Sequence, residues 1–425
     1  MMQLPESLDG WLALLESRHE QQIQLGLERV SEVFGKAGLA LSCPVITVGG
    51  TNGKGSVCAM LEAILLAAGY RVGLYTSPHL LRFNERVRLA GREVDDATLV
   101  DAFGRVEAAR GETPLTYFEH GTLAALAIFE QAALDVVILE VGLGGRLDAV
   151  NLLDADCAIV TSVAMDHMDF LGDSREAIGF EKAGIFRPGR PAIIGDPLPP
   201  ESLLRHASEV GADLQVSGRD FGFSGDRTQW AFWGRNGLKR GGLAYPALRG
   251  ANQLLNAAAT LAALDALKPL LPVQMQAVRQ GLMLVELPGR FQILPGRPAV
   301  VLDVAHNPQA AGVLSENLSN MGYYPETWAV FGMLADKDVA GVVQLMRGRV
   351  DHWLLASPPG PRGLPAAQLA EIVSAVSGCE DVRVCASVAE AFELAGKSAA
   401  EGDRILAFGS FLTVAEVMKA LRKQR

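Results

Sequence analysis

The sequence predicts an α/β protein built from two domains, and three observations support this fold class. Short apolar strands alternate with helical segments from Val45 onward. The strands are unbroken apolar runs, as expected when helices cover both faces of a parallel sheet. A stretch rich in proline and glycine, residues 286–300, interrupts the alternation, which then restarts. We therefore expect a doubly wound α/β domain followed by a smaller α/β domain.

Composition limits the class of protein. The 425 residues, 49% of them hydrophobic, suffice for two or three domains. No apolar run reaches the length of a membrane span, and the acidic N-terminus does not resemble a signal peptide. The five cysteines form no Cys-x-x-Cys pair, which is typical of a reduced, cytoplasmic protein. With a net charge of −10 and no basic run, we expect neither a nucleic-acid nor a membrane partner.

The expected elements follow the chain in order. Helical spacing of apolar residues predicts helices within residues 1–40. The first domain is then expected to contain strands at 45–50, 71–77, 136–142 and 157–163, a helix at 56–69, short antiparallel strands within 213–250 and a helix at 251–267. The second should contain strands at 299–305, 327–333, 352–357, 382–386 and 404–410. We predict domains at 1–285 and 298–425, joined by a linker at 286–297.

The stretch "GGTNGKGS" (residues 49–56) lies between a predicted strand and a predicted helix. Glycine-rich turns in this position direct backbone N–H groups toward phosphates, and the lysine reaches the outer phosphates. The stretch departs from G-x-x-x-x-G-K-[ST], because Val48 stands at the first glycine and Gly55 follows Lys54. An ordinary turn is the less favoured alternative, since the flanking strand and helix both fit.

Because the hydroxyl beside the lysine is missing, we expect metal-binding groups at neighbouring strand ends, where ligands gather in open α/β sheets. Ser77 ends one strand and Glu140 another, while Asp166, His167 and Asp169 follow a third. A carboxylate that closes an apolar strand suits Mg²⁺ beside a phosphate loop. An ordinary strand-end acid remains the alternative for Glu140.

Two other patterns are weak. "GLGG" after Glu140 does not continue as a dinucleotide fingerprint, because Leu147 stands at the third glycine. Taken singly, His79, His120 and His306 are best interpreted as ordinary core or surface histidines.

Several motifs together resemble one family, folylpolyglutamate synthase, and specifically its bacterial bifunctional dihydrofolate synthase form in the Mur ligase superfamily. They are "GTNGKGS", "TSPHLLRFNER", "LTYFEHGTLAAL", "LEVGLGGRLDAVN", "DHMDFLG", "EKAGIFRPG", "LPGRFQ", "DVAHNP" and "FGSFLTV". The resemblance implies an N-terminal P-loop ATPase domain of Mur ligase type and a C-terminal Rossmann-like glutamate ligase domain. It also implies ATP-dependent ligation of L-glutamate to 7,8-dihydropteroate and to reduced folates through an acyl phosphate.

The resemblance also implies site residues. ATP would be bound by Thr51, Asn52, Gly53, Lys54, Asn252, Arg290 and Asp303. Metal would be bound by Ser77, Glu140, His167 and a carboxylated Lys182. The pterin substrate would be bound by Thr116, Tyr117, Phe118, Glu119, Leu147, Asp148 and Ala149, and glutamate by His306 and Ser410. The catalytic roles would fall to Lys54, Lys182 and His306. The expected cofactors are ATP and two Mg²⁺ ions per site, with K⁺ as a compatible monovalent cation.

Alternatives remain open at this point. Lys182 would otherwise be a plain solvated lysine, and Tyr117 and Phe118 would simply pack under a helix. Three alternative functions also remain. The chain could be a folylpolyglutamate synthase that lacks the dihydropteroate reaction, a cell-wall Mur ligase, or a nucleotide-dependent switch without ligase chemistry. A cell-wall ligase is disfavoured because about forty residues precede the first strand, too few for an extra domain. The family implies a monomer.

Overall fold

The computed structural model describes residues 4–18, 24–226 and 228–423. The chain divides into two compact units. The first unit comprises Met1–Val163, Asp173–Ala247 and Leu254–Val285, and the second comprises Ala164–Gly172, Leu248–Gln253 and Glu286–Arg425. Two short segments therefore belong to the second unit although their neighbours in sequence belong to the first.

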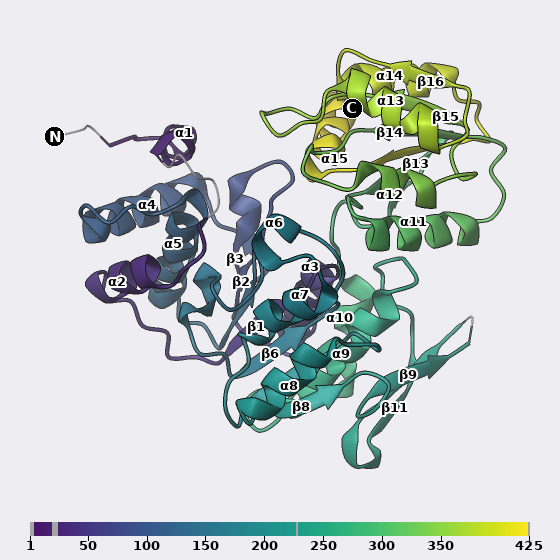
Figure 1. The fold of residues 1–425 in the computed structure, drawn as a ribbon. Helices are drawn as coiled ribbons and strands as arrows, with labels where there is room; N and C mark the ends of the chain where they lie inside the picture. Colours follow the sequence, from purple (N-terminus) through teal and green to yellow (C-terminus); the bar gives the residue numbers. More distant parts are fainter. Residues whose placement is uncertain (1–3, 19–23, 227, 424–425) are drawn as a thin grey trace. The chain divides into compact units, whose positions relative to one another are not determined.

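The first unit contains an eight-stranded sheet in the order β4-β3-β2-β5-β1-β6-β7-β8 (Figure 1). Its strands are β1 (Val45–Gly49), β2 (Val72–Tyr75), β3 (Val87–Leu89), β4 (Arg92–Glu93), β5 (Val136–Glu140), β6 (Cys157–Val160), β7 (Pro191–Ile194) and β8 (Asp213–Val216). Pairing is parallel from β2 to β8, and β3 and β4 add an antiparallel edge. Every residue of β1, β2, β5 and β6 is buried, which explains their unbroken apolar sequences. The predicted α/β fold class is confirmed.

Helices of the first unit pack on this sheet and on one another. They are α1 (Leu8–Arg18), α2 (Glu28–Lys36), α3 (Lys54–Ala67), α4 (Asp96–Arg110), α5 (Tyr117–Gln131), α7 (Arg175–Ala183), α8 (Glu201–Glu209), α9 (Gln253–Ala266), α10 (Met275–Leu284) and the 3₁₀ turns η1 (Phe83–Arg86) and η2 (Ala149–Leu152). A Cβ atom on Gly281 of α10 would lie 2.5 Å from the Cα atom of Ile64 in α3. Glycine therefore permits the close approach of these two helices.

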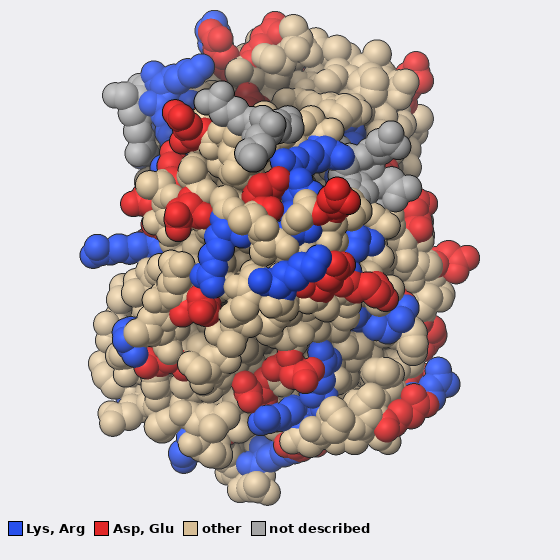
Figure 2. Space-filling view, turned by 90° about the vertical axis from the view of Figure 1, so that its left-hand side faces the viewer, with Lys and Arg blue, Asp and Glu red and all other residues tan. Residues whose placement is uncertain are grey.

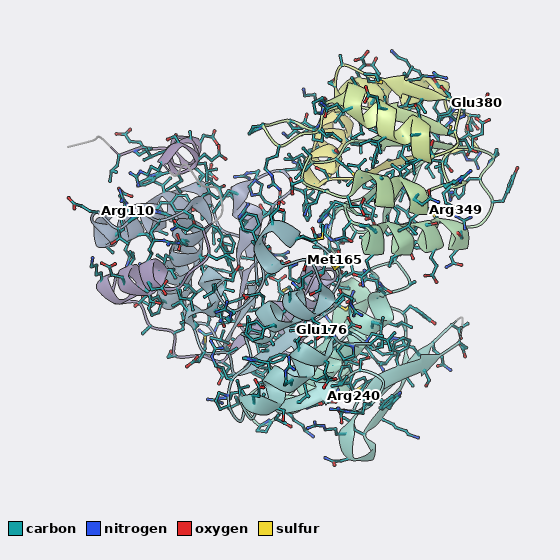
Figure 3. The ribbon with its side chains drawn as sticks, in the orientation of Figure 1. Arg110, Met165, Glu176, Arg240, Arg349 and Glu380 are labelled. Atoms are coloured by element: carbon teal, nitrogen blue, oxygen red, sulfur yellow. The ribbon has the colours of Figure 1, made fainter. Side chains whose placement is uncertain are left out.

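The structure gives the bounds of the helices predicted within residues 1–40 and corrects one of the strands predicted within residues 213–250. Within residues 1–40, the described helices are α1 and α2, and residues 19–23 lie outside the described part. Within residues 213–250, β8 pairs in parallel with β7 and extends the large sheet, so its prediction as an antiparallel strand was wrong. The following strands do form a separate antiparallel sheet: β9 (Gly222–Gly225), β10 (Trp230–Trp233) and β11 (Lys239–Leu243), with the turn η3 (Arg235–Gly237). Arg240 of β11, labelled in Figure 3, bonds to Asp265 of α9.

The second unit contains a six-stranded sheet in the order β12-β13-β17-β14-β15-β16. Its elements are β12 (Gln292–Leu294), β13 (Ala299–Asp303), β14 (Thr327–Phe331), β15 (His352–Leu355), β16 (Val382–Val384), β17 (Arg404–Phe408), α6 (Met168–Leu171), α11 (Pro308–Asn320), α12 (Val339–Leu345), α13 (Ala366–Val376), α14 (Val388–Ser398) and α15 (Phe411–Lys423). Its core includes the aromatic rings of Phe331, Trp353 and Phe408.

The segment predicted to be a linker contains part of this second sheet. Strand β12 lies within residues 286–297 and pairs with β13 in antiparallel orientation. The middle of the segment is therefore an edge strand. The prolines and glycines that indicated a linker stand on either side of Gln292–Leu294. The domain boundaries at 285 and 298 stay a prediction.

Candidate active site

The phosphate-loop candidate connects β1 to α3 in the first unit. Gly50 and Gly53 have φ values of 139° and 93°, which favour glycine. Lys54 Nζ donates hydrogen bonds to the carbonyl oxygens of Gly50, at 3.0 Å, and Thr51, at 3.2 Å. Helix α3 begins at Lys54 and is preceded by Gly53, which has no side chain to cap it. The first N–H groups of the helix and the lysine therefore form an arrangement suited to an anion.

Two hydroxyl residues on the neighbouring strand end fix this loop, and the sequence analysis missed them. Asn52 N donates to Ser162 Oγ at 3.2 Å, and Thr161 Oγ1 donates to the carbonyl of Asn52 at 2.7 Å. A Cβ atom on Gly50 would lie only 1.9 Å from Thr161 Oγ1, so the clamp requires glycine there. The available signal was the pair of hydroxyl residues directly after the apolar run of β6.

The predicted end of that strand was wrong. Strand β6 ends at Val160, so Asp166, His167 and Asp169 do not close it. They lie in the segment Ala164–Gly172, which belongs to the second unit. The apolar residues Val163 and Ala164 continue the apolar run of the sequence beyond Val160, the last residue of β6 that pairs with a neighbouring strand.

Two candidate metal ligands do lie at adjacent strand ends in the first unit. Glu140 ends β5, which pairs directly with β1, and its side chain is buried. Ser77 follows β2, and its backbone N–H donates to Glu140 Oε2 at 3.4 Å. A carboxylate and a hydroxyl are oxygen donors of the kind that Mg²⁺ and Mn²⁺ prefer, so this donor set fits such an ion. Among the residues that the structure describes, no group of three or more His, Cys, Asp and Glu side chains could hold a metal.

Lys182 lies in α7 and is only 3% exposed. The alternative of a solvated lysine is therefore wrong. Carbon dioxide adds to an amine only in its neutral form. Glu176 at the start of the same helix, labelled in Figure 3, accepts from the backbone N–H groups of Glu201 and Ser202 and so ties α7 to α8.

The pterin-site candidates at residues 116–119 form the start of α5. Thr116 Oγ1 accepts from Glu119 N at 3.2 Å, while Glu119 Oε2 accepts from Thr116 N at 2.8 Å. Glu119 Oε1 also accepts from Arg29 at 2.8 Å, so both carboxylate oxygens already have partners. Tyr117 and Phe118 are half-buried. Phe118 lies against Gly142, where a Cβ atom would be 2.6 Å from its ring.

A guanidinium group covers this aromatic region. Arg86 Cζ lies 5.2 Å from the ring centroid of Phe83 and 5.6 Å from that of Tyr117. Arg86 Nε donates to His79 Nδ1 at 2.8 Å. Burial and the charge of Arg86 lower the pKa of His79 to about 4, so this imidazole is neutral at pH 7. His120 belongs to α5 and is buried beside Trp11 and Phe103, in line with its interpretation as a core histidine.

The candidates at residues 147–149 lead into η2. Asp148 caps this turn: Oδ1 accepts from Val150 N at 3.0 Å and Oδ2 from Leu143 N at 2.8 Å. Burial nevertheless raises the pKa of Asp148 to about 6, against these hydrogen bonds and the charge of Lys54. The carbonyl of Leu147 accepts from Gly26 N at 3.2 Å, and Ala149 is buried.

In the second unit, the remaining ATP candidates gather around the end of β13. Asp303 accepts from Ala305 N at 2.8 Å and from Phe291 N at 2.9 Å. Phe291 has a φ of 42°, a strained conformation that the Asp303 contact holds. Burial raises the pKa of Asp303. Arg290 Cζ lies 4.7 Å from the ring centroid of Phe411.

Two further candidates of the second unit have different surroundings. Asn252 lies in the segment Leu248–Gln253, where the neighbouring Ala251 N donates to Asn317 Oδ1 at 2.8 Å. Ser410 is buried, and its Oγ accepts from Leu412 N at 2.9 Å at the start of α15. The structure therefore gives Ser410 a helix-capping contact.

A polar cluster surrounds Asp166 in the second unit, and its members Lys337 and Asn307 were not predicted from the sequence. Lys337 Nζ donates to Asp166 Oδ1 at 2.6 Å, and Asn307 Nδ2 donates to Oδ2 at 3.1 Å. His306 Nε2 lies 3.6 Å from Oδ2, and its Nδ1–H donates to the carbonyl of Val304 at 2.8 Å. Although burial opposes the shift, the contact with His306 and the charges of His167 and Lys337 hold the pKa of Asp166 far below its usual range. His167 and His306 are thus brought to one carboxylate.

Lysine and arginine side chains are interspersed with aspartate and glutamate on the face shown in Figure 2. No helix in the described ranges is both long enough and apolar enough to cross a membrane.

Comparisons with known proteins identify relatives over the whole length. The family model described as "Mur ligase middle domain" matches residues 48–196, and that described as "Mur ligase, glutamate ligase domain" matches residues 289–411. The dihydrofolate synthase/folylpolyglutamate synthase of Escherichia coli (strain K12) is 47% identical over 424 residues, which are 100% of this chain and 97% of that protein.

Solved structures agree with these matches. A structure of E. coli FolC in complex with DHPP and ADP has a TM-score of 0.94 at 47% identity and covers 100% of both chains. A bifunctional folylpolyglutamate synthase/dihydrofolate synthase with Mn, AMPPNP and L-glutamate bound has a TM-score of 0.91 at 46% identity. That match covers 99% of this chain and 100% of the other.

Proposed function

The chain belongs to the bifunctional dihydrofolate synthase/folylpolyglutamate synthase family of the Mur ligases, and from this premise we propose how its residues perform the ligation. It is an ATP-dependent ligase that joins L-glutamate to 7,8-dihydropteroate and to reduced folates. The observation that carries the proposal is the phosphate loop with Lys54 and the start of α3. This loop follows β1, and Glu140 ends the neighbouring strand β5.

The chemistry requires that a carboxylate be activated, because it would otherwise have to expel an oxide ion. A carboxylate oxygen of the folate substrate attacks the γ-phosphorus of ATP, the bond to the β–γ bridging oxygen breaks, and ADP leaves. The glutamate amine then attacks the acyl phosphate, forms the amide and expels inorganic phosphate, and the amine loses a proton. Lys54 stabilises the charge on the phosphoryl oxygens during the first step.

The metal ligands we propose are Ser77, Glu140 and His167 for one ion, with His167 and a carboxylated Lys182 for a second. Divalent ions, when bound, neutralise phosphate charge. Ser77 takes the place of the hydroxyl that the phosphate loop lacks. Manganese is bound in a relative, as noted above.

The substrate roles follow from the resemblance and the surroundings of each residue. We assign ATP to Thr51, Asn52, Gly53, Lys54, Asn252, Arg290 and Asp303, the pterin to residues 116–119 and 147–149, and glutamate to His306 and Ser410. The aromatic rings of Tyr117 and Phe118 suit a flat heterocycle. We also propose a nucleotide-binding domain at residues 1–285 and a glutamate ligase domain at residues 298–425. The protein is proposed to be a monomer in the cytoplasm.

One assay tests the function. Purified protein receives ATP, Mg²⁺ and labelled glutamate, with dihydropteroate and a reduced folate as separate acceptors. We expect label in both products, and ADP release that requires both acid and glutamate. Label in reduced folates alone would limit the enzyme to polyglutamylation. Turnover with UDP-muramyl substrates would instead indicate a cell-wall ligase.

The carboxylation of Lys182 has its own test. Carbon-13 bicarbonate should label a carbamate in active protein. Lys182→Ala should be nearly inactive and should regain activity with a short carboxylic acid. A bare amine in fully active protein would contradict the modification without affecting the ligase assignment.

A further inference from the structure

The Asp166 cluster has a feature that the ligation chemistry above does not use: a buried ion pair between segments distant in the chain. The side chains of Lys337 and Asp166 are 6% and 8% exposed, and 171 residues separate them. Burial takes both charges out of water, so each depends on the other, and losing one partner leaves an uncompensated charge. Such a pair tolerates few alternative geometries.

Lys337 contacts one histidine of the cluster directly and is linked to the other through Asp166. Its ammonium group also donates to His167 Nε2 at 3.4 Å. Asp166, held by Lys337, donates nothing itself but accepts from His167 N at 2.9 Å and lies beside His306 Nε2. His167 has a φ of 52°, an unfavourable backbone conformation that its surroundings must maintain.

We propose that Lys337 is a positioning residue of the ligase: by holding Asp166, it fixes the Ala164–Gly172 segment with His167, and it fixes His306, in one arrangement. Met165, labelled in Figure 3, marks this segment. The inference rests on the proposed function, because His167 and His306 are there assigned to metal and glutamate. Lys337 acts through Asp166 and these side chains, and it needs no contact with substrate.

The first experiment separates kcat from KM. Lys337→Met should lower kcat about 100-fold, because misplacing reacting groups by about 1 Å costs that much. The KM for ATP should stay within about twofold, because the phosphate loop is held by Thr161 and Ser162 and not by Lys337. A large rise in the KM for glutamate with unchanged kcat would overturn the positioning role.

A double variant distinguishes positioning from mere stability. Lys337→Met should unfold at a lower temperature, because Asp166 remains charged and buried. Asp166→Asn with Lys337→Met removes both charges and should restore the unfolding temperature, while kcat remains at least about tenfold low. If the double variant regains both stability and kcat, the pair is only structural. Lys397→Met is the matched control, since Lys397 forms an exposed ion pair with Glu393; it should change neither quantity.

A spectroscopic readout is independent of turnover. In protein with nitrogen-15 labelled histidines, Lys337→Met should shift the ring signals of His167 and His306, assigned with His167→Gln and His306→Gln. His352, which contacts Asp381 and Glu326, should not shift. Unshifted His167 and His306 signals would overturn the inference, whereas a wild-type enzyme without ligation would overturn only the proposed function.

Discussion

At the residue scale, Lys54 is the side chain on which the nucleotide site depends most directly. Its ammonium group is already held over its own loop by two carbonyl groups. Lys54→Ala should lower kcat by at least about 1,000-fold, because one lost charge contact on a transferring phosphoryl group costs several kcal/mol. ADP release measures this effect. Lys36→Ala, which removes an exposed ion pair with Glu32, should have normal turnover. Normal ADP release from a folded Lys54→Ala protein would exclude the loop from the reaction.

A second residue, Asp148, should make stability depend on pH. Its pKa is raised to about 6 in the folded protein, because of burial, from 3.8. The folded state therefore binds the proton more tightly, and the resulting stabilisation is lost as pH rises through 4 to 6. The free energy of unfolding of wild type relative to Asp148→Ala should fall by about 2 kcal/mol from pH 4.5 to 7.5. Denaturant titrations measure it, and a constant difference would show that Asp148 has an ordinary pKa.

At the element scale, the start of α5 combines a capping box with an ion pair. Thr116→Ala should cost about 1 kcal/mol, the usual value of an N-cap. Glu119→Ala should cost about 3 kcal/mol, because it also leaves Arg29 without its carboxylate in a largely buried position. Ser387→Ala, at the exposed N-cap of α14, is the matched control and should cost about 1 kcal/mol. Equal costs for Thr116→Ala and Glu119→Ala in chemical denaturation would mean that the ion pair adds nothing.

Elements differ in how well the sequence predicts them, and the reason is physical. The buried strands β1, β5 and β6 have unbroken apolar runs, so their pattern identifies them. Strand β8 contains Asp213 and Gln215, because it lies at the edge of the sheet, and its alternation resembled an antiparallel strand. Strand β12 is only three residues long and lies among prolines and glycines. Edge strands have weak patterns because fewer neighbours constrain them.

At the scale of the whole molecule, nucleotide binding should stabilise the folded protein. At ATP concentrations about 100 times Kd, with Mg²⁺, the free energy of unfolding should rise by about 2.7 kcal/mol. Thermal unfolding followed with and without nucleotide measures this. EDTA should remove much of the increase, and Lys54→Ala should show little of it. Equal stabilisation of the Lys54→Ala protein would place the nucleotide elsewhere.

The candidate site could be predicted only where its residues form local motifs. Thr51–Lys54, Ser77 and Glu140 were proposed from the sequence because each lies at or near the end of a predicted strand. Lys337 was not, since its partner lies 171 residues away and nothing nearby in sequence indicates the pairing. Thr161 and Ser162 were missed for a related reason: strand order, which places β6 beside β1, is a property of the whole sheet.

The second unit is made of three separate segments of the chain, which matters for the design of truncated fragments. A fragment starting at Glu286 would contain the sheet of the second unit and all of its described helices except α6, but it would lack Ala164–Gly172 and Leu248–Gln253. Lys337 would then be exposed without Asp166, and Asn317 would lose its contact with Ala251. The proline- and glycine-rich stretch at residues 286–300 is therefore a poor place to divide the protein into fragments. Exchange of this C-terminal part between relatives would have to transfer the segments Ala164–Gly172 and Leu248–Gln253 together with it.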